Sequence, residues 1–187
     1  MKLVALSLAI ALAAGALRGG RVSALSDLRI RFAPLALVAF AMQLVNPPGR
    51  WPLVLLLGSF VLLSIVAVVN LRTPGFALVL VGLAMNLAVV AVNGGMPVDR
   101  EAIVASGQLD TLEGLVQQRA VKHHLAGPAD RLRFLADEIA LPPPVAQVVS
   151  LGDVFTYGGV GAIVAAGMRR RRTPQLVPIG EARRVQV

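Results

Sequence analysis

The chain has 187 residues, of which 56% are hydrophobic, and its mean hydropathy is +0.74. Soluble domains contain roughly 45–50% apolar residues, so this composition argues against an ordinary soluble domain and indicates a protein of the lipid bilayer. The formal net charge is +8, but the positive residues form short blocks beside apolar runs, and the chain has no cysteine, which argues against a nucleic-acid partner and excludes disulfides and thiol chemistry.

The first apolar run covers residues 3–17. As a helix it would be only ~22 Å long, against a bilayer core of ~30 Å. Lys2 and the small residues 14–16 also allow a cleaved signal peptide. The arginines that follow the run favour an uncleaved helix with its N-terminus outside, because positive flanks stay in the cytoplasm; they are Arg18, Arg21, Arg29 and Arg31.

Three more apolar runs follow, at residues 32–45, 51–69 and 76–92. The first two are separated by an Asn-Pro-Pro-Gly turn at 46–49, so they are expected to form a hairpin. The third ends at Asn93-Gly94-Gly95, which is typical of a helix C-terminal cap.

A fifth run, residues 154–168, ends at four consecutive arginines, 169–172. Such a cluster marks the cytoplasmic end of a membrane helix. The expected fold is therefore all-α: a polytopic bundle of about five transmembrane helices in the bacterial cytoplasmic membrane, with the N-terminus outside and the C-terminus cytoplasmic. Residues 1–172 are expected to form one membrane domain and residues 173–187 a cytoplasmic tail.

The polar segment 93–153 then lies on the outer face. Apolar residues recur in it at near-helical spacing and predict two short amphipathic helices, at about 111–126 and 129–139. The three prolines at 142–144 predict an extended return to the membrane.

Asp153 is the first candidate for chemistry, because it is a carboxylate at the mouth of the fifth helix. The alternative is that Asp153 and Ser150 only cap this helix. Asp130 and Asp137 are possible catalytic partners, since acid–base hydrolysis uses two carboxylates. Their alternative is a role as solvated surface charges, with a possible helix cap at Asp130.

A polar cavity or binding site is the other candidate, formed by Asn86, Asn93, His123, Ser150 and Asp153. Asparagines within apolar helices are also explained by hydrogen bonds between helices. His123 and His124 are adjacent, so on a helix they would point about 100° apart and would not chelate one ion. No metal or cofactor site is predicted.

Several short motifs resemble a small bacterial multi-pass membrane family of unknown function, DUF5317. They are Asn93-Gly94-Gly95-Met96-Pro97, Lys122-His123, Leu135-Ala136-Asp137, Leu141-Pro142 and Val149-Ser150-Leu151-Gly152-Asp153. The resemblance implies a polytopic membrane protein and implies no activity.

A fainter likeness is to lipoprotein signal peptidase, an aspartic peptidase of the bacterial inner membrane. Its motifs correspond in order to 93–95, Asp130-Arg131 and 150–153. Gly127 and Ser150 stand where that family has asparagine, and the spacing before Asp130 is longer. The likeness implies a dyad of Asp153 with Asp130 or Asp137.

Three functions are therefore left open. The first is a non-enzymatic membrane protein whose outer segment binds a partner or lipid. The second is an aspartic membrane peptidase-like hydrolase, and the third is a small transporter or transporter subunit with a polar path. Membrane lipids are the expected partners, together with a membrane-protein partner or a second copy of the chain.

Overall fold

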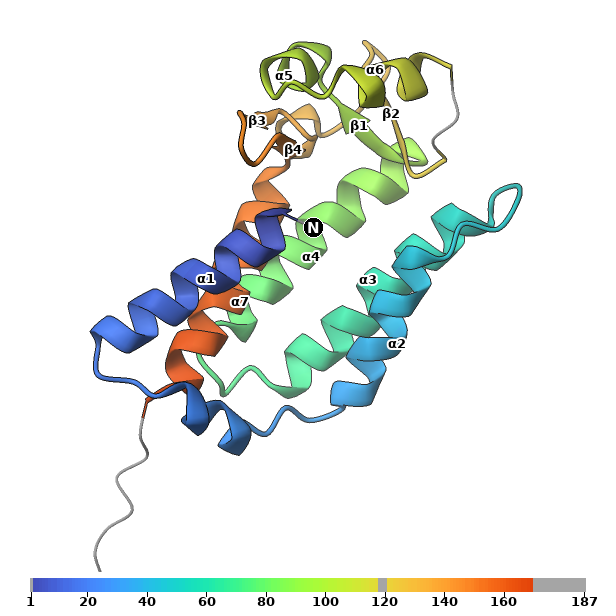
Figure 1. Cartoon of the computed structure of the whole chain (residues 1–187). Helices are drawn as coiled ribbons and strands as arrows, with labels where there is room; N and C mark the ends of the chain where they lie inside the picture. Colours follow the sequence, from blue (N-terminus) through green and yellow to red (C-terminus); the bar gives the residue numbers. More distant parts are fainter. Residues whose placement is uncertain (1, 118–120, 170–187) are drawn as a thin grey trace, which may run out of the picture.

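The computed structural model describes residues 2–117 and 121–169. Five apolar helices lie side by side, and a small polar unit covers one end of them (Figure 1). The helices are α1 (Lys2–Leu17), α2 (Ala33–Leu44), α3 (Trp51–Val69), α4 (Phe76–Asn93) and α7 (Leu151–Gly167). All five lie where the apolar runs predict helices. The expected tail, 173–187, is outside the described residues.

The helices pack in the order α1, α7, α4, α3, α2. A short 3-10 helix, η1 (Val22–Asp27), connects α1 to α2 at the end opposite the polar unit. Apolar side chains from α3 and α4, among them Leu56, Phe60 and Leu83, form the main core. Met96 and Leu135 extend this core into the polar unit, so the two parts share one apolar interior.

Two helices, α3 and α4, are long and apolar enough to cross a membrane, judged by length and composition. The other apolar helices are shorter, and α2 has only 12 residues, which corresponds to ~18 Å. Five crossings therefore stay a prediction.

The polar unit, called the cap below, comprises the described residues 94–117 and 121–150. Its β1 (Met96–Val98) pairs in parallel with β2 (His123–Leu125), and β3 (Ile139–Leu141) pairs antiparallel with β4 (Gln147–Val149). Backbone hydrogen bonds also attach the segment around Asp137 to β1. Asp137 N–H donates to Pro97 O, and Asp99 N–H donates to Asp137 O. The helical parts of the cap are α5 (Arg100–Ala105), α6 (Leu109–Val116) and the 3-10 turn η2 (Arg133–Leu135).

The prediction of two amphipathic helices, at about 111–126 and 129–139, is wrong for most of their length. The first is confirmed only as α6, because residues 123–125 are extended and pair with β1. The second is reduced to the single turn η2. Leu132 before it has a positive φ of 55°, and Ala136 after it is extended, so no helix passes through either point. The protein is mostly helical, and strand pairing in the cap overrides the helical spacing.

Candidate functional site

The N-terminus of α7 carries a complete capping box. Ser150 Oγ accepts a hydrogen bond from Asp153 N–H at 3.0 Å, and Asp153 Oδ2 accepts one from Ser150 N–H at 3.2 Å. Asp153 therefore caps its helix, as the simpler interpretation of this pair predicts.

Asn86 of α4 joins this capping box from the neighbouring helix. Its Nδ2 donates to Asp153 Oδ1 at 2.7 Å, and its Oδ1 accepts a hydrogen bond from Ser150 Oγ at 2.9 Å. Asn86 is 5% exposed and Ser150 is fully buried. Three of the five residues expected in a polar site therefore meet at the junction of α4 and α7, where their polar groups bond to one another.

Asn93 lies about two turns beyond Asn86, at the end of α4, and does not join the other three. Its side chain donates to Val89 O and Arg131 O, and it accepts a hydrogen bond from Arg131 N–H. These bonds attach the Arg131 loop of the cap to the end of α4.

Asp130 binds His124 and the backbone of the cap. Its Oδ1 lies 2.9 Å from His124 Nε2, and its Oδ2 accepts a hydrogen bond from Gly127 N–H at 2.7 Å. Burial alone would raise the pKa of Asp130, but the bonds from Gly127 and His124, with the charges of His124 and Arg133, lower it. Asp130 is thus held by local hydrogen bonds within the cap, and it pairs with His124 as an ion pair when that histidine is protonated.

Asp137 is the buried acid of the cap, although the sequence also allows a solvated role for it. It is 8% exposed, and its Oδ1 is a buried oxygen without a hydrogen-bond partner. The backbone bonds to Pro97 and Asp99 hold it between β1 and η2. A buried polar atom without a partner is rare and costs free energy, so it calls for an explanation.

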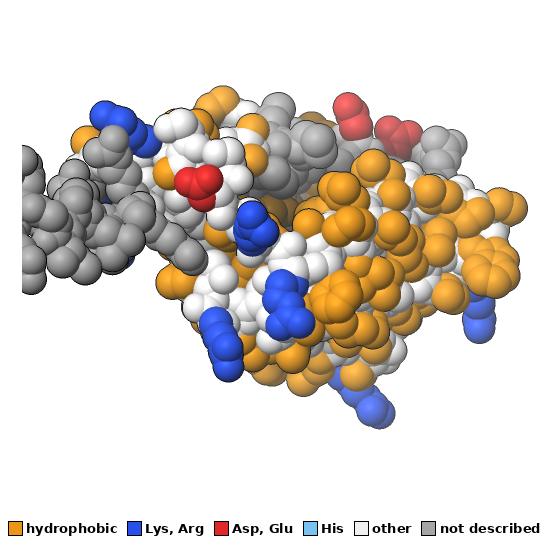
Figure 2. Space-filling view, turned by 90° about the horizontal axis from the view of Figure 1, so that it is seen from below, with side chains coloured by type: hydrophobic (Ala, Val, Ile, Leu, Met, Phe, Trp, Pro, Cys, Tyr) orange, Lys and Arg blue, Asp and Glu red, His pale blue; other side chains and the backbone are white. Residues whose placement is uncertain are grey.

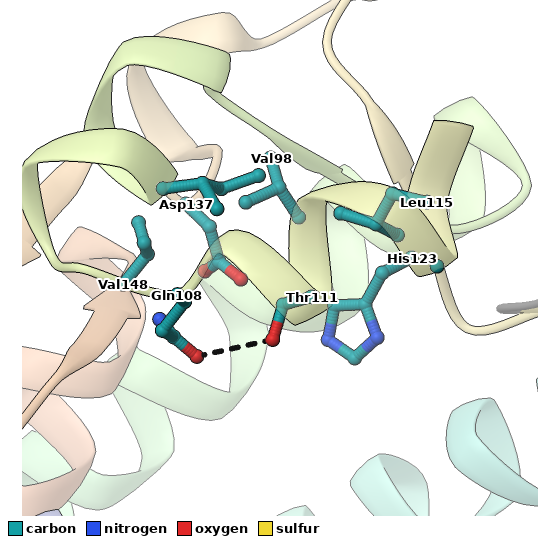
Figure 3. A pocket seen from close by; sticks show the side chains of 9 residues that line it. Val98, Gln108, Thr111, Leu115, His123, Asp137 and Val148 are labelled. Carbon is teal, nitrogen blue, oxygen red and sulfur yellow. Dashed lines mark hydrogen bonds between the residues drawn. The ribbon is translucent and has the colours of Figure 1, made fainter. Parts of the chain in front are cut away.

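The Asp137 carboxyl faces a pocket of about 410 Å³ in the cap. Figure 3 shows the polar ends of Asp137, Gln108, Thr111 and His123 pointing toward the same part of the pocket, with Val98 and Leu115 above them. The complete lining is Val98, Ile103, Gln108, Thr111, Gly114, Leu115, His123, Asp137 and Val148. Residues from both sides of the cap therefore form one small amphipathic chamber.

The surroundings of Asp137 and His123 favour the neutral forms of both side chains. Burial, with a smaller contribution from the negative charge of Asp153, raises the pKa of Asp137 to about 8. The loss of water around its ring also lowers the pKa of His123, although part of this residue is exposed at the surface; Asp153 opposes this shift, whereas Lys122 and His124 add to it. Lys122 itself points away and donates to Gln43 O at 2.6 Å.

Sequence reasoning named Asp137 and His123 but missed Gln108, Thr111 and the pocket between them. The structure buries Asp137 together with Leu135 and Ala136 and leaves Glu138 exposed. The sequence signal that could have indicated this difference is the apolar pair directly before Asp137. No group of three or more His, Asp or Glu side chains suited to a metal ion occurs in residues 2–117 and 121–169.

Residues 24–165 match the model of a family of unknown function, DUF5317. The chain belongs to this family. An uncharacterized protein of Thermotoga maritima is 30% identical to it over 145 residues, which are 76% of this chain and 81% of that protein. No solved structure matches the chain. The family resemblance expected from motifs in residues 93–153 is therefore confirmed, and the DUF5317 match includes both the cap and α7.

Proposed function

We propose that this DUF5317 protein is an integral membrane protein whose cap binds a small amphipathic molecule with a positive charge. The observation that carries the proposal is Asp137: a buried carboxyl, with one oxygen lacking a partner, that faces a pocket of about 410 Å³. A bound ammonium group would supply the missing hydrogen bonds and the countercharge together.

The remaining lining of the pocket supports a cation with an apolar body. Val98, Ile103, Leu115 and Val148 supply apolar surface, and the lining contains neither lysine nor arginine. His123 adds no positive charge near neutral pH, because burial lowers its pKa. Mostly apolar pockets with a few convergent polar groups are typical of small-molecule sites.

A membrane location is supported by apolar side chains exposed on the outward faces of the helices. Large apolar residues are more than 40% exposed on α2, α3 and α4, among them Leu37, Phe40, Val54, Val61 and Val81. Water-soluble monomers rarely expose apolar surface this continuously, whereas lipid chains would cover it.

The distribution of charge supports a topology with the cap outside. Eight of the ten acidic residues lie between Asp99 and Asp153. The opposite end of the bundle carries arginines in the segments that join the helices, as expected for a cytoplasmic side; they include Arg18, Arg21, Arg29, Arg31 and Arg72.

The test uses three six-carbon probes that differ only in their polar group: hexylamine, hexanol and hexanoate. Melting of the full-length protein in detergent at pH 8 is expected to shift upward with hexylamine alone. At ten times the dissociation constant the stabilisation would be about 1.4 kcal/mol. Equal shifts with all three probes would contradict the proposal.

A matched pair of variants localises the effect. Asp137→Asn removes the carboxylate from the pocket and should abolish the response to hexylamine. Glu138→Gln makes the same chemical change at the adjacent, exposed position and should preserve the response. A response retained by Asp137→Asn would place the amine elsewhere.

An aspartic hydrolase is the second candidate, and one observation favours it: the charge of Asp153 raises the pKa of Asp137, as in a coupled acid pair. Both Asp153 oxygens accept hydrogen bonds from the helix cap and Asn86, which gives that carboxylate a complete structural role. Hydrolysis of a fluorogenic peptide that is lost in both Asp137→Asn and Asp153→Asn, with expression unchanged, would replace the binding proposal with this one.

A further inference from the structure

A second pocket lies at the end of the bundle opposite the cap. Its volume is about 610 Å³, and three segments far apart in the sequence line it: the end of η1, the turn between α3 and α4, and the end of α7. Each segment contributes one arginine, namely Arg29, Arg72 and Arg169. Figure 2 views this end of the molecule and shows Lys and Arg side chains scattered among apolar ones.

Within residues 2–117 and 121–169, no ion pair neutralises these three arginines. Asp27 is the single acidic residue in the lining, so the pocket has a net positive formal charge. The ion pair found in the described part of the chain joins His124 and Asp130 in the cap, so these arginines form none there. Among the described residues, no carboxylate occupies their guanidinium groups, which leaves these groups to an anionic ligand.

Hydrogen bonds of neighbouring residues join the three segments that line this pocket. Asn70 is 5% exposed and bonds both backbone groups of Arg31, with its Oδ1 accepting from N–H and its Nδ2 donating to the carbonyl, each at 2.9 Å. The same Nδ2 donates to Val66 O at 2.8 Å, which ties the segment after η1 to the end of α3. Arg21 N–H donates to Met168 O at 2.9 Å and ties the start of η1 to the end of α7.

We propose that this pocket binds a phosphate group, either on the headgroup of an anionic lipid or as free phosphate. Guanidinium groups match phosphate oxygens in charge and geometry, and several of them converging on one concavity give a selective site. The ends of α3 and α7 and the start of α4 lie at this level, which is headgroup depth in the membrane placement proposed above. The proposal that the phosphate belongs to a lipid rests on the proposed membrane location, whereas the proposal that the arginines bind phosphate does not.

The test compares three additives with full-length protein in a non-ionic detergent: dioctanoyl phosphatidylglycerol, dioctanoyl phosphatidylcholine and inorganic phosphate. Apparent affinities come from the rise in melting temperature with concentration. Phosphatidylglycerol should bind more tightly than phosphatidylcholine, because the net positive pocket favours an anion. Arg72→Gln and Arg29→Gln should each weaken its binding by about tenfold, the loss expected for one charge-assisted hydrogen bond.

Arg18→Gln is the matched control, because Arg18 lies at the same end of the bundle but does not line the pocket. This variant should bind phosphatidylglycerol like the wild type. Loss of affinity equal to that of Arg72→Gln would show a diffuse basic face and overturn the proposal. Equal binding of both lipids would overturn it too, because the arginines would then not select an anion.

The phosphate arm distinguishes the source of the ligand. Stabilisation by inorganic phosphate at the concentrations at which lipid acts assigns the site to a soluble phosphate, and stabilisation by lipid alone assigns it to a headgroup. The melting temperature of each variant without additive reports folding separately. The hexylamine series tests the Asp137 pocket at the other end of the molecule. A negative result in one series therefore does not contradict the proposal that the other series tests.

Discussion

A carboxyl group buried as deeply as Asp137 resists ionisation, because it leaves water without gaining a countercharge. Its pKa of about 8 therefore means that the folded protein holds a proton on Asp137 at neutral pH. An unfolded chain would release that proton near pH 3.9. The difference makes this residue a source of pH-dependent stability.

The folded state should lose stability as the pH rises from 6.5 to 8. In this range the unfolded chain has lost the Asp137 proton and the folded protein still holds it, so the free energy of unfolding falls with pH. The total loss is expected to be roughly 1–2 kcal/mol. Unfolding in detergent, followed by circular dichroism at several pH values, measures it.

Asp137→Asn should remove this slope, because asparagine does not titrate, and should leave the variant more stable than the wild type at pH 8. Glu138→Gln should keep the slope. His123 does not cause this loss, because its pKa is lowered in the folded state and its titration would therefore make stability rise with pH. A slope that persists in Asp137→Asn would show that another group causes it.

At the scale of residues, the sequence predicted the role of Asp153 better than that of Asp137. Ser150 and Asp153 form a local capping pattern, and local patterns are visible in sequence because their partners lie three residues apart. Asp137 depends on β1, α6 and β2, which the chain brings together from residues 96–125. Apart from the apolar pair Leu135 and Ala136, the residues next to Asp137 in the sequence do not indicate these long-range contacts.

At the scale of elements, close contact between α4 and α7 organises the molecule. Gly82 of α4 lies against Gly152 O and Thr156 of α7, and Gly159 of α7 lies against the backbone of Gly75 and Val79. Small residues at such crossings let helix backbones approach and pack without large side chains between them. The contact also brings Asn86 within reach of the α7 cap.

Adjacent glycines on α7 test this contact. A Cβ at Gly159 would lie 2.7 Å from Gly75 O and Val79 N, whereas a Cβ at Gly158 would have no neighbour within 4 Å. Gly159→Ala should therefore lower stability by about 1–3 kcal/mol. Gly158→Ala should leave stability unchanged or raise it. Melting of both variants in the same detergent decides, and equal melting temperatures would argue against the close crossing.

The bond between Asn86 and Asp153 should contribute coupled stability. Asn86→Ala leaves buried polar groups of Asp153 and Ser150 without this partner, which should cost ~1–3 kcal/mol. The double variant with Asp153→Ala should lose less than the sum of the single losses, by about 0.5–3 kcal/mol. Additive losses in chemical unfolding would show that the bond contributes nothing, and Asn46→Ala, at an exposed turn, serves as the control.

The helices of the bundle were predictable and the cap was not. Each long helix is a continuous apolar run between Pro, Gly and Arg, so its limits appear in composition alone, as at 51–69. The cap strands have only three residues each, and pairing over a distance decides whether 123–125 is helix or strand. The near-helical spacing of Leu125 and Leu132 does not reveal that residues 123–125 pair with β1.

At the scale of the whole molecule, charge divides the protein into two unlike ends. The cap holds most of the acidic residues and the amphipathic pocket, and the opposite end holds the arginine pocket. If α3 and α4 cross the membrane as an antiparallel pair, the turn between them and the cap lie on opposite sides. The two proposed sites would then serve different compartments.

This arrangement predicts which positions a membrane-impermeant maleimide reaches in intact cells. The chain has no cysteine, so a single introduced cysteine gives an unambiguous signal. Glu101→Cys, exposed on α5 of the cap, should be labelled without permeabilisation, because the arginine-rich end stays in the cytoplasm. Ser26→Cys, exposed in η1, should be labelled only after the membrane is opened. The opposite pattern would invert the topology, and labelling of both in intact cells would mean that the segment between them does not cross the bilayer an odd number of times.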